Sequence, residues 1–207
     1  CARCLLGLVL LFSTSNHNLI SAKLTPQPCN GILERLTVDF ETDNYGNPYH
    51  AGHVPKGLPG GIGWVKGKRK RNKPPDNDAI LFNASNPPGG DTAIGFENEG
   101  LVLIISEDND ASDPDDYRFG GLLRFNFATP LHALHSMRFL DFQAREPSRI
   151  VAKTRSGKEI SQEIPRTKNH KAVTVELEDW YDLSLVRVDM EGSGAIAALD
   201  VTTCTRK

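Results

Sequence analysis

The sequence has few aromatic residues, little net charge and no long apolar run after its first residues. Only 7% of its 207 residues are aromatic, whereas Gly and Pro are plentiful, with 18 and 13 residues. This composition favours short strands joined by many turns over helices. A formal net charge of −2 provides no overall attraction to nucleic acid or to an acidic membrane surface. We therefore expect neither partner, and we expect one all-β domain.

The sequence also lacks the motifs of common catalytic sites. It contains no G-x-S-x-G nucleophile elbow, no H-E-x-x-H zinc motif and no P-loop. His132 and His135 lie three residues apart, so on a regular strand they face opposite sides and form a poor metal pair. Carboxylates are numerous, but no spacing selects two of them as the acid and base of a glycosidase. The sequence therefore predicts a protein that is not an enzyme.

The longest apolar segment, Leu5–Phe12, lies at the start of the chain. It follows the positive charge of Arg3, and either Ser13–Ser15 or Ile20–Ala22 after it offers a small residue before a cleavage site. This order is typical of a secretory signal peptide, and the segment is too short to span a bilayer. We therefore predict a signal peptide over residues 1–22 and a secreted, extracellular domain over residues 23–207.

Cysteine is scarce, and two of the four cysteines, Cys1 and Cys4, fall within the predicted signal peptide. The other two, Cys29 and Cys204, lie near the two ends of the predicted domain. The first and last strands of a β-sandwich often lie side by side, and the extracellular compartment is oxidising. We therefore predict a Cys29–Cys204 disulfide, with two free cysteines as the alternative.

Short apolar or alternating segments bounded by turn residues predict about ten strands. Leu101–Ile105 is continuously apolar and is expected to be buried on both faces. The basic segment Trp64–Lys73 is expected to be an exposed loop or the tip of a hairpin. The pattern indicates an antiparallel β-sandwich of jelly-roll type. Its expected strands are Ile32–Phe40, Asp78–Asn83, Leu101–Ser106, Leu122–Phe127, Leu131–Phe142, Arg149–Thr154, Glu159–Ile164, Ala172–Leu177, Leu183–Met190 and Ala195–Val201.

Five segments together resemble a family of secreted domains found in bacterial surface proteins and in marine extracellular proteins. These segments are Val38–Asp43, Ala79–Asp91, Leu103–Asp108, Gly120–Phe127 and Gly192–Leu199. The family has a galactose-binding-like β-sandwich, which is the scaffold of many carbohydrate-binding modules. The chain is also similar to skeletal organic matrix proteins of stony corals. The resemblance implies an extracellular, non-catalytic domain; the basic segment Lys66–Lys73 departs from the family pattern.

Two groups of carboxylates are candidate Ca²⁺ sites. In the acidic loop after Leu101–Ile105, Asp108, Asp110 and Asp113 supply oxygen ligands of the kind that Ca²⁺ prefers. The alternative is a solvated acidic loop. The second group is Asp39 and Glu41, two residues apart on a predicted strand and so on one face, with Asp91 and Asp200. The resemblance supports the second group, because a structural Ca²⁺ often ties the first strand of such sandwiches to the last. Its alternative is Asp39 capping a turn.

Other residues are candidates for binding or modification. Clustered Lys and Arg in Lys66–Lys73 attract dense anions such as sulfated glycans or acidic matrix polymers, or else form a solvated loop. Asn83 begins a glycosylation sequon with Ala84 and Ser85. Exposed aromatic residues stack on sugar rings, and Trp64, Tyr45 and Tyr117 are the candidates.

The sequence thus leaves two functions open. The first is a secreted matrix protein, of a skeletal or biomineral matrix, that is stabilised by Ca²⁺ and contacts anionic polymers or calcium mineral. The second is a carbohydrate-binding module or lectin whose partners are extracellular glycans.

Overall fold

The computed structural model describes residues 26–70, 77–88, 94–144, 146–168 and 170–205. The predicted signal peptide, residues 1–22, and Asp91 lie outside these residues. Within the described part, regular secondary structure consists of antiparallel strands, and no helix is long and apolar enough to cross a membrane. The strands are β1 (Ile32–Val38), β2 (Gly52–His53), β3 (Ile62–Arg69), β4 (Ala79–Asn83), β5 (Leu101–Ile105), β6 (Gly121–Ala144), β7 (Ser148–Thr154), β8 (Glu159–Ile164), β9 (Ala172–Glu176), β10 (Tyr181–Met190) and β11 (Gly192–Thr205).

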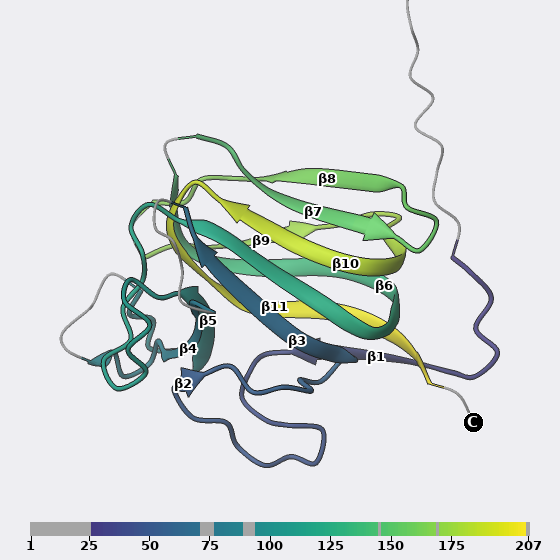
Figure 1. The fold of residues 1–207 in the computed structure, drawn as a ribbon, viewed down its shortest axis with the longest axis horizontal. Coiled ribbons are helices and arrows are strands. Elements are labelled where there is room, and N and C mark those ends of the chain that lie inside the picture. The colour runs from purple at the N-terminus through teal and green to yellow at the C-terminus, as the bar shows by residue number, and fades with distance from the viewer. Residues whose placement is uncertain (1–25, 71–76, 89–93, 145, 169, 206–207) are drawn as a thin grey trace, which may run out of the picture.

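The strands form two layers (Figure 1), which confirms the predicted antiparallel β-sandwich. The front layer has the order β3, β6, β10, β7 and β8, and the back layer contains β2, β4, β5, β11, β6 and β9, with β1 paired to β11. Strand β6 belongs to both layers. Its first part pairs with β3 and β10, and its second part pairs with β11 and β9.

The length of β6 corrects one prediction, because two separate strands were expected in this region. Leu183 of β10 lies opposite Leu131, whereas Leu185 lies opposite Asn126. The extra residues on β6 between these pairs form an irregularity, as a β-bulge does, and bulges bend strands. The bend carries one continuous strand from the front layer to the back layer.

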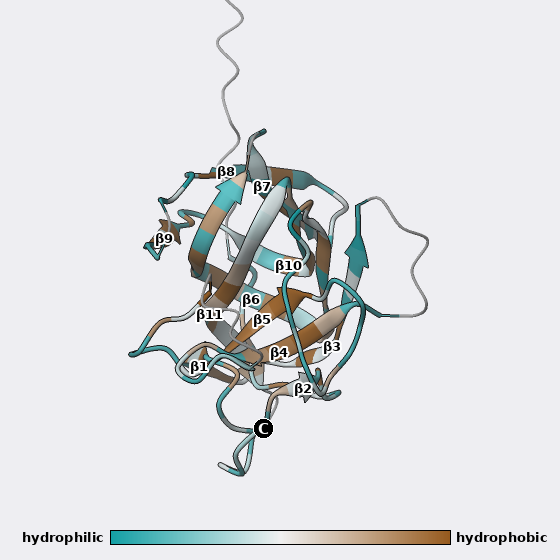
Figure 2. Ribbon diagram, turned by 90° about the vertical axis from the view of Figure 1, so that its left-hand side faces the viewer, coloured by the Kyte–Doolittle hydropathy of each residue, from teal (hydrophilic) through white to brown (hydrophobic). Residues whose placement is uncertain are grey.

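The main hydrophobic core lies between the two layers. The inward residues of β6, such as Leu123 and Phe125 in front and Met137 and Phe139 at the back, are fully buried. Strand β5 is buried on both faces, as predicted. Its residues Leu101, Leu103 and Ile105 join the main core, whereas Val102 and Ile104 join a second cluster with Ile80, Phe82 and Ile94. Figure 2 shows apolar segments along β4 and β5.

The expectation of a basic loop at Trp64–Lys73 is wrong for its first half, which is strand β3. Val65, Gly67 and Arg69 are buried and alternate with exposed Trp64, Lys66 and Lys68. A Cβ on Gly67 would lie 2.4 Å from the backbone nitrogen of Ala79, so only glycine fits where β3 passes β4. Arg69 pairs with the buried Asp78, with 3.3 Å between Nε and Oδ2. The burial of these residues depends on contacts with another segment of the fold, which the sequence of β3 alone does not reveal. Residues 71–76 of this segment are not described.

The predicted disulfide is confirmed. Cys29 and Cys204 are bonded, with their Cα atoms 5.8 Å apart, and they close a loop with a sequence separation of 175 residues. The bond lies beside the pairing of β1 with the end of β11, where Leu33 is opposite Cys204. It therefore joins the first strand to the last.

We expect loss of this disulfide to destabilise the fold. Because the closed loop is long, its cross-link contributes up to about 5 kcal/mol by restricting the unfolded chain. Urea unfolding with and without reductant measures this contribution. The Cys29→Ala/Cys204→Ala variant is the control, since reductant should leave its midpoint unchanged. An equal midpoint for the oxidised and reduced protein would show that the bond adds no stability.

Candidate functional site

The outer side of the front layer is an open sheet face, here called the front face. Its central residues are the exposed and half-exposed side chains of β3, β6 and β10, which lie opposite one another in register. Directly opposed residues in antiparallel strands have Cβ atoms about 5 Å apart. The three rows across these strands are Trp64, Asn126 and Leu185; Lys66, Arg124 and Arg187; and Lys68, Leu122 and Asp189.

The middle row brings three cations side by side. Lys66 of β3 lies opposite Arg124 of β6, and Arg124 lies opposite Arg187 of β10. Arg187 is held by Asp189 on its own strand, with 3.2 Å between Nε and Oδ2. Within the described residues, no carboxylate oxygen lies within 4.0 Å of the charged nitrogens of Lys66 or Arg124. Among the described residues, Lys66 and Arg124 therefore carry positive charge without an ion-pair partner, whereas Arg187 has Asp189.

Trp64 lies next to this row, two residues from Lys66 on the same side of β3. Its side chain is on the exposed side of β3, and the residue is 40% exposed. The guanidinium carbon of Arg124 lies 5.9 Å from the centroid of the indole ring, which is within cation–π range. This contact holds the Arg124 side chain beside the ring. The pair therefore offers an aromatic surface and a cation next to each other.

Two hollows flank this pair. One is a groove of about 290 Å³, which has apolar residues such as Val151 and Leu185 and longer charged side chains around them. The other, of about 390 Å³, includes Trp64 and Lys66. The groove is lined by Leu122, Arg124, Val151, Ala152, Lys153, Glu159, Leu185 and Arg187. Apolar residues with a few convergent polar groups are typical of ligand sites.

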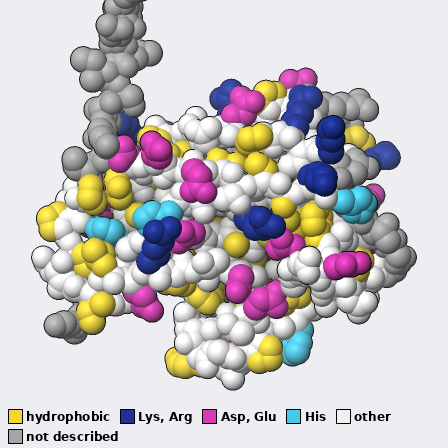
Figure 3. All heavy atoms as spheres, turned by 180° about the vertical axis from the view of Figure 1, so that it is seen from behind, with side chains coloured by type: hydrophobic (Ala, Val, Ile, Leu, Met, Phe, Trp, Pro, Cys, Tyr) yellow, Lys and Arg dark blue, Asp and Glu magenta, His cyan; other side chains and the backbone are white. Residues whose placement is uncertain are grey.

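The outer side of the back layer has a different arrangement of charge. Arg35 donates from Nε to Asp200 Oδ1 at 3.0 Å, and Arg138 donates from Nε to Glu99 Oε1 at 3.0 Å. Figure 3 shows basic and acidic side chains intermixed on this side. Both of these back-layer cations thus have a carboxylate partner, unlike Lys66 and Arg124.

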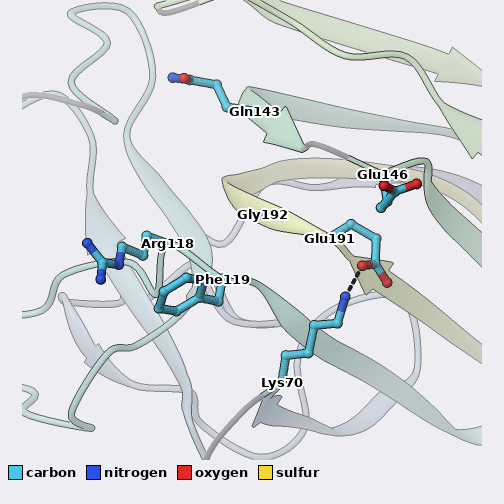
Figure 4. Close-up of a pocket in the computed structure, with 7 residues that line it drawn as sticks. All are labelled: Lys70, Arg118, Phe119, Gln143, Glu146, Glu191 and Gly192. Carbon is cyan, nitrogen blue, oxygen red and sulfur yellow. Dashed lines mark hydrogen bonds and ion pairs between the residues drawn. The ribbon is translucent and has the colours of Figure 1, made fainter.

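A larger pocket of about 520 Å³ lies where the ends of β3, β6 and β10 meet (Figure 4). Lys70 and Glu191 point toward each other there and form an ion pair. Arg118 lies over the ring of Phe119, 4.6 Å from its centroid. The Lys70 charge is thus already neutralised within the pocket, so the pocket is a weaker candidate than the front face.

The structure separates the three predicted sugar-binding aromatic residues. Trp64 is on the front face. Tyr45 is 90% exposed in the turn around Asp43 and Asn47. Tyr117 is only 7% exposed, lies in the main core, and packs edge-on against Phe119 with ring centroids 5.4 Å apart. The prediction for Tyr117 is therefore wrong, because tertiary packing buries a residue that local sequence placed in a loop.

The predicted convergence of Asp39, Glu41 and Asp200 is not found. Asp39 Oδ1 accepts a hydrogen bond from the Glu41 backbone N–H at 3.1 Å, so Asp39 caps a turn. Phe40 between them has φ of 63°, which breaks the strand alternation. Glu41 accepts the backbone N–H of Leu101, and Asp200 binds Arg35. These carboxylates thus serve three separate structural contacts.

The acidic loop uses its carboxylates in local turns. Asp108 Oδ1 accepts the backbone N–H of Asp110 at 2.8 Å, and Asp110 Oδ1 accepts both the N–H and the hydroxyl of Ser112. The bonds from Ser112 lower the pKa of Asp110. In the described part of the chain, no group of three or more His, Cys, Asp or Glu residues is placed to hold a metal ion. Calcium binding by Asp108, Asp110 and Asp113 stays a prediction.

The glycosylation sequon lies at the end of β4. Asn83 Oδ1 accepts hydrogen bonds from the Ser85 hydroxyl at 2.9 Å and from the Asn86 backbone N–H at 3.1 Å. Asn83 itself is half-buried. Its modification stays a prediction.

We expect Ca²⁺ to raise the Tm of the protein relative to its Tm in chelator. If the acidic loop binds Ca²⁺ only when folded, Ca²⁺ at about 100 times Kd adds about 2.7 kcal/mol and raises Tm by about 5–10 °C. The Asp108→Asn/Asp110→Asn variant keeps the acceptor oxygens of the turns but loses the charges, so its Tm should not respond. Asp43→Asn, in another turn, is the control. An unchanged Tm of the parent protein in Ca²⁺ and in chelator would contradict the prediction.

We expect the Arg35–Asp200 pair to make stability fall at acid pH. The hydrogen bond and charge of Arg35 lower the pKa of Asp200 in the folded state. The contribution is therefore present above the unfolded pKa of about 3.9 and is lost as pH falls through the lower, folded pKa. Asp200→Asn should remove this part of the pH dependence. Because Arg35 is exposed, the Tm difference should be at most about 2–4 °C. Parallel Tm profiles of both proteins between pH 5 and pH 2 would refute this.

The chain was also compared with known proteins. No protein-family model matches the sequence, and the search of curated proteins found no match. Solved structures of family 29 carbohydrate-binding modules show a similar arrangement. A variant of CBM29-2 matches with a TM-score of 0.39 and 11% identity, covering 84% of this chain and 87% of that chain.

Two further structures give similar values. A carbohydrate-binding module of family 29 has a TM-score of 0.36 and 10% identity, with 84% and 90% of the two chains covered. Another CBM29-2 variant, complexed with cellulohexaose, has a TM-score of 0.36 and 10% identity, with 83% and 92% covered. At these values the matches assign no ligand to this chain.

Proposed function

We propose that this protein is a non-catalytic domain that binds an extracellular polysaccharide on its front face. The observation that carries the proposal is the exposed Trp64 beside a groove with apolar residues and charged neighbours. A sugar ring has an apolar face of C–H groups and a polar edge of hydroxyls. It therefore suits an aromatic surface that is flanked by hydrogen-bonding side chains.

The shape of the face favours a polymer over a single small ligand. The hollow at Trp64 and the groove at Arg124 lie on the two sides of the contact between these two side chains. An open sheet surface allows an extended chain to pass over both hollows. Arg124, Lys153 and Glu159 would then contact hydroxyls along the chain.

The groove offers little for hydrolysis. Glycosidases place two carboxyl groups on either side of the scissile bond. Among the described residues that line the groove, Glu159 alone has a carboxylate. Binding without cleavage is therefore the function that we propose. The disulfide fits an oxidising, extracellular setting, which contains polysaccharides.

We expect Trp64→Ala to weaken polysaccharide binding strongly. Truncation of an aromatic side chain at the centre of a binding site costs about 2 kcal/mol or more, which is about thirtyfold in Kd. Affinity electrophoresis against a panel of soluble polysaccharides identifies a ligand, and calorimetry then measures Kd. Tyr45→Ala is the matched control, because Tyr45 is a more exposed aromatic residue outside the front face. Equal losses in both variants, or none in Trp64→Ala, would contradict the proposed site.

A further inference from the structure

We propose that the polysaccharide is polyanionic, with sulfate or carboxylate groups that are bound by Lys66, Arg124 and Arg187. This inference rests on the proposed function and concerns the same front face. The groups that carry it are three cations in one row across β3, β6 and β10.

The row of three cations costs the fold stability. Like charges that lie directly opposite each other on neighbouring strands destabilise a sheet. The chain has 26 acidic residues against 24 basic ones, so carboxylates are in excess. Nevertheless, in the part of the chain that the structure describes, only Asp189 forms an ion pair with a member of the row. A ligand that brings negative charge would relieve this repulsion.

The cations of the row also differ from their neighbours in the residues that lie opposite them. Toward the edge of the front layer, Lys153 lies opposite Glu159 and Arg149 lies opposite Glu163, so basic and acidic residues alternate across β7 and β8. Behind the sandwich, Arg35 and Arg138 have carboxylate partners. At the centre of the front face, next to Trp64, the described residues that lie opposite Lys66, Arg124 and Arg187 include no carboxylate.

The two arginines of the row each have a contact that positions them in the absence of a ligand. Arg124 lies against the Trp64 ring, and Arg187 is bonded to Asp189. A guanidinium group offers several N–H donors in a planar fork that matches the oxygens of sulfate or carboxylate. Lys66 adds a mobile point charge at the end of the row. The row crosses the strands, so the acid groups of the polymer would follow one another across β3, β6 and β10.

The surroundings of the row favour a glycan over other polyanions. An acidic peptide or a mineral surface would be attracted by the cations alone. The exposed indole and the apolar residues of the groove add a surface for sugar rings, at the same place as the cations. The combination favours an acidic polysaccharide over either of these.

The test compares polymers with one backbone and different charge. Dextran sulfate and uncharged dextran form one pair, and polygalacturonate and its methyl ester form another. We expect the parent protein to bind the charged member of at least one pair at least tenfold more tightly than the uncharged member. Its Kd should rise with NaCl concentration, because salt screens exposed charges.

The affinity of variants for the charged polymer shows which residues bind it. Lys66→Gln/Arg124→Gln should lose at least tenfold in affinity for the charged polymer. Arg35→Gln/Arg138→Gln removes the same amount of charge from the back layer and should change the affinity less than threefold. Arg124→Lys keeps the charge and should retain more affinity than Arg124→Gln. A Tm well above the temperature of the binding assay for every variant excludes unfolding as the cause.

Each of the other outcomes would refute either the polyanion inference, the proposed polysaccharide binding, or both. Equal binding of charged and uncharged polymers, with a loss in Trp64→Ala, would refute the polyanion inference and keep polysaccharide binding. Binding of poly-glutamate as tight as that of the charged glycans, with no loss in Trp64→Ala, would show a purely electrostatic surface and refute the glycan. Binding of none of these polymers or of the wider panel would refute both.

Discussion

The fold depends on one strand that is shared by both layers of the sandwich. The first part of β6 pairs with β3 and β10, and its second part pairs with β11 and β9. Both parts contribute fully buried side chains to the same core, with Phe125 in front and Phe139 at the back. Because Phe125 is fixed between the layers, its neighbour Arg124 must point outward on a pleated strand. The position of the central cation of the front face is therefore a consequence of core packing.

The two outer sides of the sandwich show how a protein with little net charge can present a charged surface. On the back layer, the arginines Arg35 and Arg138 bond to carboxylates from other segments. On the front layer, Lys66 and Arg124 have no such partner among the described residues, and they lie beside an exposed indole. Net charge alone, at −2, argued against an anionic partner such as nucleic acid. The arrangement of charge on a sheet, and not its sum, decides which polymer the surface can bind.

The sequence predicted the features that depend on residues close together along the chain, such as the strands. Alternation and apolar runs located most of the strands, including β5 with its two buried faces, and the two cysteines outside the predicted signal peptide are the ones that pair. The patterns failed where burial depends on distant partners. Strand β3 is rich in Lys and Arg, so it resembles a loop, but Gly67 fits against Ala79 and Arg69 bonds to the buried Asp78. Tyr117 was expected to be exposed because no local pattern marks it as part of the core.

The same contacts explain why, among the described residues, Asp108 and Asp110 form no ion pair with the exposed lysines of β3. Arg69 at the end of β3 donates to the backbone carbonyl of Glu107, so the strand and the loop are tied together. The charge of Arg69, however, is matched by the buried Asp78, and Asp108 and Asp110 accept hydrogen bonds within their own loop. A buried ion pair that loses one partner is strongly destabilising, which keeps Arg69 turned inward. The exposed residues Lys66 and Lys68 are consequently left to face solvent on the opposite side of β3, where a ligand can reach them.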